Sequence, residues 1–280
     1  MAGPIKITCM REENDVGEAQ ILVVGIGEVG GALARLIERR TPVLRHDLEP
    51  RDFDGPIGVM HLCIPFRTAA EFEESALSYI ARFNPALTII NSTVLPGMTR
   101  KVAERSGAAV AFSPVRGKHI RMIEDMTRYV KFVAAPDDAA AAHAEEHFRS
   151  VGMKTRRMSR VETLELAKIS ETSYFGVLIG FAQELNRFAE RVGGDYFEAV
   201  EFFQEIDFLP GARYFPGIIG GHCVIPNLHL MLQVGPSALF EAILESNDLR
   251  VCEIDGPAAE KSGQAKKKGT LDEGKLLADS

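Results

Sequence analysis

Short apolar runs alternate with amphipathic stretches over the first half of the chain. The runs with the composition of strands are 21–24, 42–47, 57–66, 87–94, 108–115 and 128–135. Apolar positions at helical spacing predict helices over 30–40, 68–83 and 137–152. Strands that alternate with helices are typical of a parallel sheet with helices on both faces. The pattern therefore predicts a doubly wound α/β domain over residues 1–158.

A different pattern begins after residue 158. Residues 160–192 keep apolar side chains at helical spacing over an unusually long stretch, and a second helix is predicted over 196–206. We expect residues 159–250 to form a smaller, all-helical domain that makes a homodimer through the helix 160–192. Residues 251–280 are polar and glycine-rich, so we expect a disordered tail there.

The apolar positions of the long predicted helix form one stripe. Its members are Leu164, Ala167, Phe175, Leu178, Ala182, Leu185, Phe188 and Val192. Gly176 and Gly180 lie four residues apart within the helix, where small residues would let another helix approach closely. The stripe therefore predicts the face on which this helix packs.

Composition and charge exclude several classes of protein. The chain has 280 residues, of which 46% are hydrophobic, and a net charge of −7, which gives no support for a nucleic-acid surface. Its four cysteines are scattered, so we expect reduced thiols rather than a disulfide framework. The N-terminal residues lack the pattern of a signal peptide, and the longest apolar run, 174–182, is too short to cross a membrane. We therefore expect a cytoplasmic protein with neither nucleic-acid nor membrane partners.

The sequence GIGEVG follows the first predicted strand and opens the first predicted helix. In this context Gly-x-Gly-x-x-Gly is the signature of dinucleotide binding. The first glycine permits a tight turn, the second lets a pyrophosphate approach the backbone, and the third lets helix and strand pack closely. We predict a Rossmann-type domain in which the cofactor contacts Gly25, Gly27, Glu28, Val29 and Gly30.

Asp47 ends the second predicted strand, about 20 residues beyond the glycine motif. A carboxylate at this position can accept a hydrogen bond from the ribose 2′-hydroxyl and would repel a 2′-phosphate. The sequence therefore favours NAD over NADP as the cofactor. Arg45 and Arg51 lie nearby, and either guanidinium could pair with the extra phosphate of NADP, which leaves that alternative open.

Three side chains are candidates for catalysis. Cys223 precedes a predicted helix with Pro226 in its first turn, and a helix start favours a thiolate. Lys168 lies on the apolar stripe, where an ammonium can donate a proton or stabilise an oxyanion. Thr93 follows a strand, at the edge of the sheet where such folds bind ligands. Each residue also has a purely structural interpretation. Cys223 could be a small apolar residue in a tight corner, Lys168 a lysine at the edge of the stripe, and Thr93 a threonine that ends a strand.

His143 and His147 are four residues apart on a predicted helix, like the histidine pair of a zinc site. No glutamate follows the first histidine, and no third ligand is evident. We therefore interpret them as part of a solvated helix face and predict no metal site.

Four motifs together, GIGEVG, NSTVLPGMTR, ELAK and GGHC, resemble those of the UDP-glucose/GDP-mannose dehydrogenase family. The resemblance covers about 21–244 and implies a short, divergent member without the family's third domain. Members of that family oxidise the C6 alcohol of a nucleotide sugar to a carboxylate with two NAD, through a cysteine thiohemiacetal and thioester. The resemblance makes Cys223 the nucleophile, Lys168 the oxyanion-stabilising lysine and Thr93 the threonine of the S-T-V motif.

The chain departs from the family pattern at three polar positions. Val115 replaces a glutamate linked to thioester hydrolysis, Thr172 replaces an asparagine, and Asn227 replaces an aspartate that handles protons. An amide cannot accept a proton at neutral pH, so the general-base role is lost at position 227. The resemblance therefore implies an NAD-dependent oxidoreductase that acts on an alcohol or aldehyde of a sugar-like, anionic substrate. The replaced residues give no support for full four-electron oxidation of a nucleotide sugar.

Several residues are expected to bind the substrate. They are Arg116, Lys118, His119, His222 and Asn227. Two other functions remain open at this stage. The chain is also similar to β-hydroxyacid dehydrogenases, which share the Rossmann domain, long helix and catalytic lysine but give Cys223 no role. A catalytically degenerate protein that binds NAD as a regulatory ligand is the third possibility, and the replaced polar positions favour it.

Overall fold

The computed structural model describes residues 19–49, 51, 53–117, 121–207, 214–221 and 223–255. The chain divides into two compact units. The first unit comprises Met1–Ser92 and Thr99–Arg157. The second comprises Met158–Ser280 together with Thr93–Met98, a short segment drawn from the middle of the first unit's sequence.

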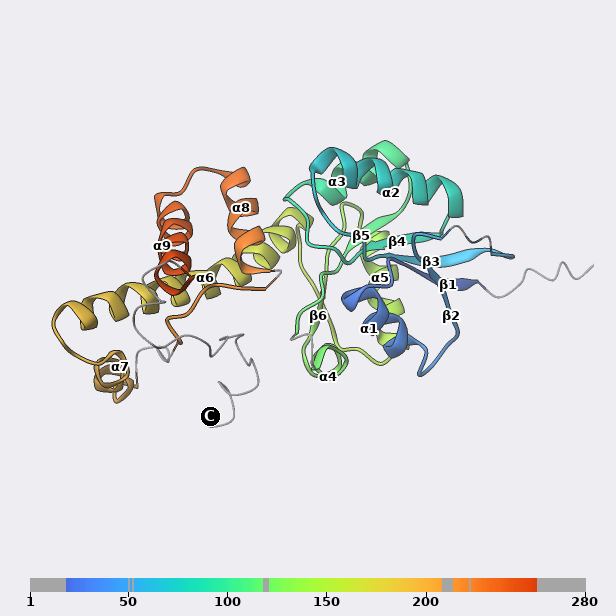
Figure 1. The fold of residues 1–280 in the computed structure, drawn as a ribbon. Coiled ribbons are helices and arrows are strands. Elements are labelled where there is room, and N and C mark those ends of the chain that lie inside the picture. The colour runs from blue at the N-terminus through green and yellow to red at the C-terminus, as the bar shows by residue number, and fades with distance from the viewer. Residues whose placement is uncertain are drawn as a thin grey trace, which may run out of the picture. The chain divides into compact units, whose positions relative to one another are not determined.

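The first unit is built on a parallel five-stranded sheet (Figure 1). Its strands are β1 (Gln20–Val24), β2 (Val43–His46), β3 (Ile57–Leu62), β4 (Leu87–Ile90) and β5 (Val110–Phe112). Their order in the sheet is β2-β1-β3-β4-β5, and every neighbouring pair is parallel. The chain therefore winds outward from β1 in both directions, which brings the carboxyl ends of all five strands to one edge. The predicted fold class is confirmed.

Helices cover both faces of this sheet, as Figure 1 shows. One face carries α1 (Glu28–Ile37), α4 (Met122–Arg128) and α5 (Asp138–Ser150), and the other carries α2 (Ala69–Phe83) and α3 (Met98–Ser106). Two of these helices begin at side-chain caps. Thr68 accepts a hydrogen bond from Glu71 N at the start of α2, and Asp137 accepts one from Ala140 N at the start of α5. Each cap stabilises its helix by about 1 kcal/mol.

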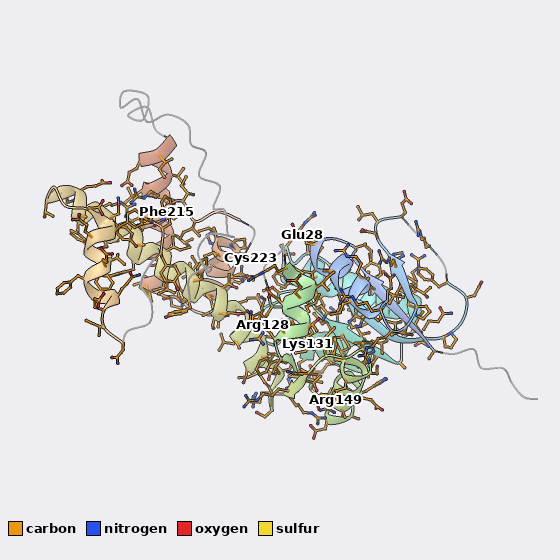
Figure 2. The ribbon with its side chains drawn as sticks, turned by 90° about the horizontal axis from the view of Figure 1, so that it is seen from below. Glu28, Arg128, Lys131, Arg149, Phe215 and Cys223 are labelled. Carbon is orange, nitrogen blue, oxygen red and sulfur yellow. The ribbon has the colours of Figure 1, made fainter. Side chains whose placement is uncertain are left out.

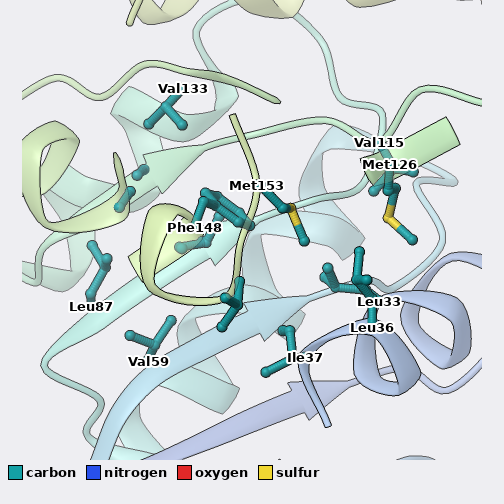
Figure 3. Close-up of a cluster of buried hydrophobic side chains, with 14 of the residues drawn as sticks. Leu33, Leu36, Ile37, Val59, Leu87, Val115, Met126, Val133, Phe148 and Met153 are labelled. Carbon is teal, nitrogen blue, oxygen red and sulfur yellow. The ribbon is translucent and has the colours of Figure 1, made fainter. Parts of the chain in front are cut away.

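A single apolar cluster fills the space between the sheet and the face with α1, α4 and α5 (Figure 3). Leu33, Ile37 and Phe148 are fully buried in it. Val115, which replaces a polar residue of the family pattern, is also a member and is 7% exposed. Burial of an apolar side chain there is favourable, whereas an unpaired carboxylate would carry a large desolvation cost. Valine therefore suits the position that this structure gives it.

The predicted strand at 128–135 does not join the main sheet by regular pairing. Its ordered part, β6 (Lys131–Val133), instead pairs in parallel with β7 (Thr155–Arg157), and one antiparallel bridge links Ala134 to Phe112. β7 has the sequence TRR and an exposed side. Its lack of an apolar run is the reason that the sequence pattern did not predict it.

The second unit is helical within its described residues (Figure 1). Its helices are α6 (Val161–Arg191), α7 (Tyr196–Gln204), α8 (Val224–Val234) and α9 (Ala238–Asp255). α9 continues five residues into the range 251–280 that was predicted to be a disordered tail, and the rest of that range lies outside the described residues. Among the described helices, none combines the length and hydrophobicity needed to cross a membrane.

The two glycines of α6 mark its packing sites on other helices of this unit. A Cβ added at Gly176 would lie 2.9 Å from Val224 Cγ1 of α8, and one at Gly180 would lie 3.3 Å from Ile243 Cγ1 of α9. The expectation that these small residues admit close helices is met within the chain itself. The sequence GVLIG thus seats two helices on one long helix.

The apolar stripe predicted for this helix does not coincide with its buried face. Phe175, Phe188 and Val192 are exposed, although Leu164 and Ala182 are buried. The face that is actually buried carries many small and polar residues, among them Ser173, Gly176, Gly180, Gln183 and Arg187. The prediction failed because hydrogen-bonded polar side chains and glycines line this contact, and neither contributes to an apolar pattern.

Candidate functional site

Three glycines set the geometry of the turn between β1 and α1. Gly25 has φ +86°, and a Cβ there would lie 2.6 Å from the Cys63 carbonyl oxygen. A Cβ at Gly30 would overlap the Gly25 carbonyl oxygen. A Cβ at Gly27, by contrast, would meet no atom within 4 Å. Two glycines therefore close the turn, and the third leaves the start of α1 open to a ligand.

The side chains around the turn divide into exposed and packed groups. Glu28, labelled in Figure 2, is exposed at the first residue of α1, whereas Val29 packs against the apolar core. Contact of Val29 with a cofactor would therefore come from its backbone. The N–H groups of the first helical turn have no acceptor within the helix, and their dipoles favour an anion.

Asp47 is the first residue after β2 and is exposed. Its Oδ2 accepts a hydrogen bond from Ile26 N at 3.3 Å, and its Oδ1 accepts one from Leu48 N at 3.0 Å. Arg45, which could have favoured a 2′-phosphate, is paired with Glu38, with Nε 3.0 Å from Oε1. The Asp47 carboxylate is thus held beside the glycine turn. The Arg45 guanidinium is already paired with the Glu38 carboxylate.

A buried polar chain lies beneath the carboxyl edge of the sheet, and the sequence pattern did not predict it. Asn91 Nδ2 donates to the Ser113 carbonyl oxygen at 2.6 Å, so its Oδ1 is the atom that faces His61 Nδ1 at 2.9 Å. His61 Nε2 lies 2.9 Å from His147 Nε2. This bonding pattern assigns the protons: His61 carries one on Nδ1, and His147 donates from Nε2.

Burial sets the charge of both rings in this chain. Burial and the nearby His147 and Lys131 hold the pKa of His61 well below its ordinary value. Burial, followed by the charge of His143, lowers the pKa of His147 to about 4. Both imidazoles are therefore neutral at neutral pH. The interpretation of His147 as part of a solvated helix face is wrong, because α5 turns this side chain into the domain interior, where it is 7% exposed.

Lys131 and Cys63 complete the polar environment under the sheet edge. Lys131 is labelled in Figure 2. Its Nζ donates to the carbonyl oxygens of Ser113 and Pro114 at 3.0 and 2.9 Å and lies 5.1 Å from the centre of the Phe148 ring. Burial raises the pKa of Cys63 to about 12, so this thiol stays protonated. Lys131 is buried and holds the turn that follows β5, whereas Cys63 is half-buried by surface area, with its Sγ 3.9 Å from Asn91 Oδ1.

In the second unit, the segment that carries Thr93 is tied to α6. Gly97 N donates to Glu165 Oε2 at 2.6 Å, and Glu165 is fully buried. Gly97 has φ +92°, a conformation that favours glycine. Lys168 is half-buried and lies three residues beyond Glu165, on the same side of the helix. The ELAK sequence therefore supplies both an anchor for the Thr93 segment and the candidate lysine.

Cys223 occupies the N-cap position of α8, as its place before Pro226 predicted (Figure 2). Its side chain is an exposed thiol with no disulfide. The next residue, Val224, is 7% exposed and packs against Gly176 of α6. Asn227 is buried at 5% exposure in the first turn of α8, with its N–H donating to the Cys223 carbonyl oxygen. The site therefore presents one thiol at a helix start that is fixed by packing.

The remaining predicted residues have mixed positions. Arg116 Nη2 donates to the Val130 carbonyl oxygen at 2.7 Å, and its guanidinium lies 4.9 Å from the centre of the Phe132 ring. These contacts hold it against β6, and its role with a substrate stays a prediction. Thr172 is half-buried on α6. The predicted substrate residues Lys118, His119 and His222 lie outside the described residues. Among the residues that are described, no group of three or more acidic, histidine or cysteine side chains could hold a metal ion.

Comparison with known proteins finds a match for part of the second unit. Residues 162–248, which carry Glu165, Lys168 and Cys223, match the central domain of the UDP-glucose/GDP-mannose dehydrogenase family. The chain is related to this family. The resemblance predicted from its four motifs is therefore confirmed.

Two proteins illustrate the relationship to nucleotide-sugar dehydrogenases. The UDP-N-acetyl-D-mannosamine dehydrogenase of Methanocaldococcus jannaschii is 26% identical over 180 residues, which cover 62% of this chain and 42% of that protein. The chain thus spans less than half the length of this relative. A solved UDP-D-ManNAc dehydrogenase from Pyrococcus horikoshii has a TM-score of 0.74 at 20% identity, over 86% of this chain and 71% of that one.

The fold is shared more widely than the family. A 3-hydroxyisobutyrate dehydrogenase from Mycobacterium tuberculosis has a TM-score of 0.66 at 16% identity, over 85% of this chain and 94% of that one. This likeness extends to the fold alone. A fold that is shared by both classes of dehydrogenase does not distinguish between their reactions.

Proposed function

We propose that the protein is an NAD-dependent dehydrogenase that oxidises an alcohol or aldehyde group of a nucleotide sugar. The observation that carries this proposal is the glycine turn, with Gly27 open and Asp47 hydrogen-bonded beside it. The match of residues 162–248 to the dehydrogenase family supports the assignment of the reaction class. Relatives that act on UDP-N-acetyl-D-mannosamine support a UDP-linked N-acetylhexosamine as the first substrate to test.

The residues of the turn fit the cofactor. Exposed Gly27 and Glu28 begin α1, where backbone N–H groups can bind a pyrophosphate, and exposed Asp47 can accept from a ribose hydroxyl. When bound, NAD supplies the acceptor for a hydride from the sugar carbon. The ion pair of Arg45 with Glu38 supports NAD over NADP, because it occupies the guanidinium that would otherwise attract a 2′-phosphate.

The second unit supplies the groups for the chemistry at the sugar. Lys168 would donate hydrogen bonds to an oxyanion, and Thr93 would orient the substrate by its hydroxyl. The Cys223 thiolate would add to an aldehyde and form a thiohemiacetal, with the carbonyl oxygen becoming the oxyanion. Asn227 cannot take a proton from water, and Val115 is part of an apolar core. We therefore propose that release of a free carboxylate is slow in this protein.

We also propose a homodimer through the helix 160–192. Tyr174, Phe181 and Phe188 recur every seven residues along α6 and are each 55% exposed. Leu178 and Leu185 lie between them at the alternating spacing of three and four that is typical of helix pairing. Phe181→Glu would leave the buried face of α6 intact and should convert the dimer to a monomer in sedimentation equilibrium.

Turnover with a defined sugar tests the proposed reaction. The protein is incubated with UDP-N-acetyl-D-mannosamine and NAD, and NADH and free uronic acid are both measured. The proposal predicts NADH formation with little free acid, and loss of the covalently bound sugar in Cys223→Ser. NADH formation from a hydroxyacid that is unaffected by Cys223→Ser would support a hydroxyacid dehydrogenase instead. Cofactor binding without oxidation of either class of substrate would favour the regulatory, NAD-binding alternative.

A further inference from the structure

The chain that leads to Cys223 is held by two buried amide side chains that no motif identifies. Gln183 lies on α6 and is fully buried, and Asn247 lies on α9 and is 6% exposed. Gln183 Nε2 donates to the Gly217 carbonyl oxygen at 2.7 Å, and Ile219 N donates to Asn247 Oδ1 at 2.7 Å. The backbone of 217–219 is thus bound at two points by side chains from two different helices.

The two amides also bind each other, which fixes their orientation. Gln183 Nε2 donates to Asn247 Oδ1 at 3.3 Å, and Gln183 Oε1 accepts from Ser246 Oγ at 3.1 Å. Arg187 Nη1 in turn donates to Ser246 Oγ at 2.9 Å. These partners fix which end of the Gln183 amide is the nitrogen and which is the oxygen. We call Gln183 and Asn247 the amide clamp.

The clamp acts close to Cys223. Ile219 is 3% exposed and packs in an apolar cluster with Val224 and Leu228, the residues that seat α8 on α6. Between Ile219 and Cys223 lie three residues, of which Gly220 and Gly221 have no side chain to pack. A glycine pair has unusual backbone freedom, so its conformation depends on how the residues that precede and follow it are held.

We propose that Gln183 and Asn247 are positioning residues that fix the segment 217–221, which precedes Cys223, and thereby orient the Cys223 thiol. Packing of Val224 against Gly176 holds the helix side of Cys223, and the amide clamp holds the side that precedes it. The role in catalysis rests on the proposed function, in which Cys223 is the nucleophile. The effect on the thiol itself does not require that function.

Two isosteric substitutions separate the hydrogen bonds of the clamp from its packing. Asn247→Asp keeps an oxygen that can accept from both Ile219 N and Gln183 Nε2. Gln183→Glu removes the donor and places an oxygen against the Gly217 carbonyl and Asn247 Oδ1, where it has no hydrogen to share. The clamp is therefore expected to tolerate the first change and to fail with the second. Gln183→Met, of similar length and uncharged, is the companion variant if Gln183→Glu does not fold.

The test is the pH profile of Cys223 alkylation by iodoacetamide, in a Cys9→Ser, Cys252→Ser background in which the other thiol is Cys63, whose pKa is raised to about 12 by burial. Circular dichroism checks the fold, and hydrogen exchange of the peptide 214–221 reports release of the segment. We expect Gln183→Glu, or Gln183→Met in its place, to change the alkylation rate by about tenfold, the factor that corresponds to one lost buried hydrogen bond, and to shift its pH midpoint. Asn247→Asp should stay within about twofold of the parent protein.

The outcomes distinguish positioning from mere stability and from the proposed reaction. Faster exchange at 214–221 with an unchanged rate and pH midpoint at Cys223 would overturn the proposal, because the segment would then move without affecting the thiol. Equal effects of Asn247→Asp and Gln183→Glu would also overturn it. A shifted alkylation profile together with no oxidation of any nucleotide sugar would leave the amide clamp supported and the proposed function refuted.

Discussion

The Asp47 carboxylate and the Ile26 backbone N–H are joined by a hydrogen bond of 3.3 Å between Oδ2 and N. Ile26 is the second residue of the glycine turn, so this bond places an anionic side chain beside the turn before any cofactor is bound. A carboxylate in this position selects against a ribose 2′-phosphate by charge, whereas an amide oxygen would keep the bond from Ile26 N without the charge. The geometry therefore permits a test in which selectivity changes and folding does not.

We predict that Asp47→Asn reduces the preference for NADH over NADPH. The asparagine oxygen can still accept from Ile26 N, although the bond from Leu48 N is lost. Repulsion of the 2′-phosphate is lost as well, which corresponds to about 1–2 kcal/mol or a fivefold to thirtyfold change in the affinity ratio. Fluorescence titration with both cofactors measures this ratio. Glu49→Gln is the matched control, an exposed acid two residues further along the chain. An unchanged ratio in Asp47→Asn would refute the role assigned to the carboxylate.

The glycine turn and Asp47 were predictable because each depends on local sequence. Gly25 needs a positive φ and Gly30 needs the absence of a Cβ, and both requirements select one residue type at a fixed spacing. The position of Asp47 was predictable because it directly follows the last residue of β2. The doubly wound sheet was predictable for the same reason, since strand and helix periods are read along the chain.

The polar contacts between distant segments were not predictable in this way. Glu165 bonds Gly97 across 68 positions of sequence, and His61 bonds His147 across 86. A histidine at helical spacing gives the same pattern whether it faces water or a buried partner, so His147 was assigned to the wrong face. On α6 the buried side chains include Gln183 and Arg187, whose hydrogen bonds compensate their burial without leaving any apolar signal.

The buried histidine pair predicts that the protein loses stability as the pH falls. The pKa of His147 is about 4 in the folded chain against about 6.5 when unfolded, and that of His61 is also lowered. Stability from these neutral rings is present above about pH 6.5 and decreases as the pH falls toward 4, because the unfolded chain then binds more protons. Between pH 7 and pH 5 the expected loss in urea unfolding is about 2 kcal/mol from His147, and the lowered pKa of His61 adds to it in the same direction.

His147→Gln checks the assignment of this pH dependence. The glutamine amide can still donate to His61 Nε2 but does not titrate, so the pH dependence should weaken by the contribution of His147, about 2 kcal/mol between pH 7 and pH 5. His143→Gln is the control, an exposed histidine one helical turn away, and should leave most of the dependence in place. A pH profile that is the same in His147→Gln as in the parent would show that other groups dominate.

The Glu165 side chain is predicted to hold the Thr93 segment. Glu165→Ala removes the acceptor for Gly97 N and should increase hydrogen exchange of the segment Thr93–Met98 by about tenfold or more, with a loss of stability of about 1–3 kcal/mol. Glu165→Gln retains an acceptor oxygen and should protect this segment better than alanine does. Mass-spectrometric exchange on the peptide that contains Gly97 makes the comparison. Equal protection from exchange in Glu165→Ala and in the parent protein would contradict the role of Glu165 as an anchor of this segment.

NADH titration of a Gly27 variant tests the central claim most directly. A Cβ at Gly27 would meet nothing within 4 Å, and the φ of −71° at this position suits any residue. Gly27→Val should therefore fold like the parent protein while it fills the space that a pyrophosphate needs. Gly235→Val is the control, since Gly235 is extended and equally open but lies in the second unit. We predict saturable NADH binding in the parent and in Gly235→Val, and its loss in Gly27→Val. Binding of equal affinity in Gly27→Val, or no binding by the parent protein at millimolar NADH, would contradict the account.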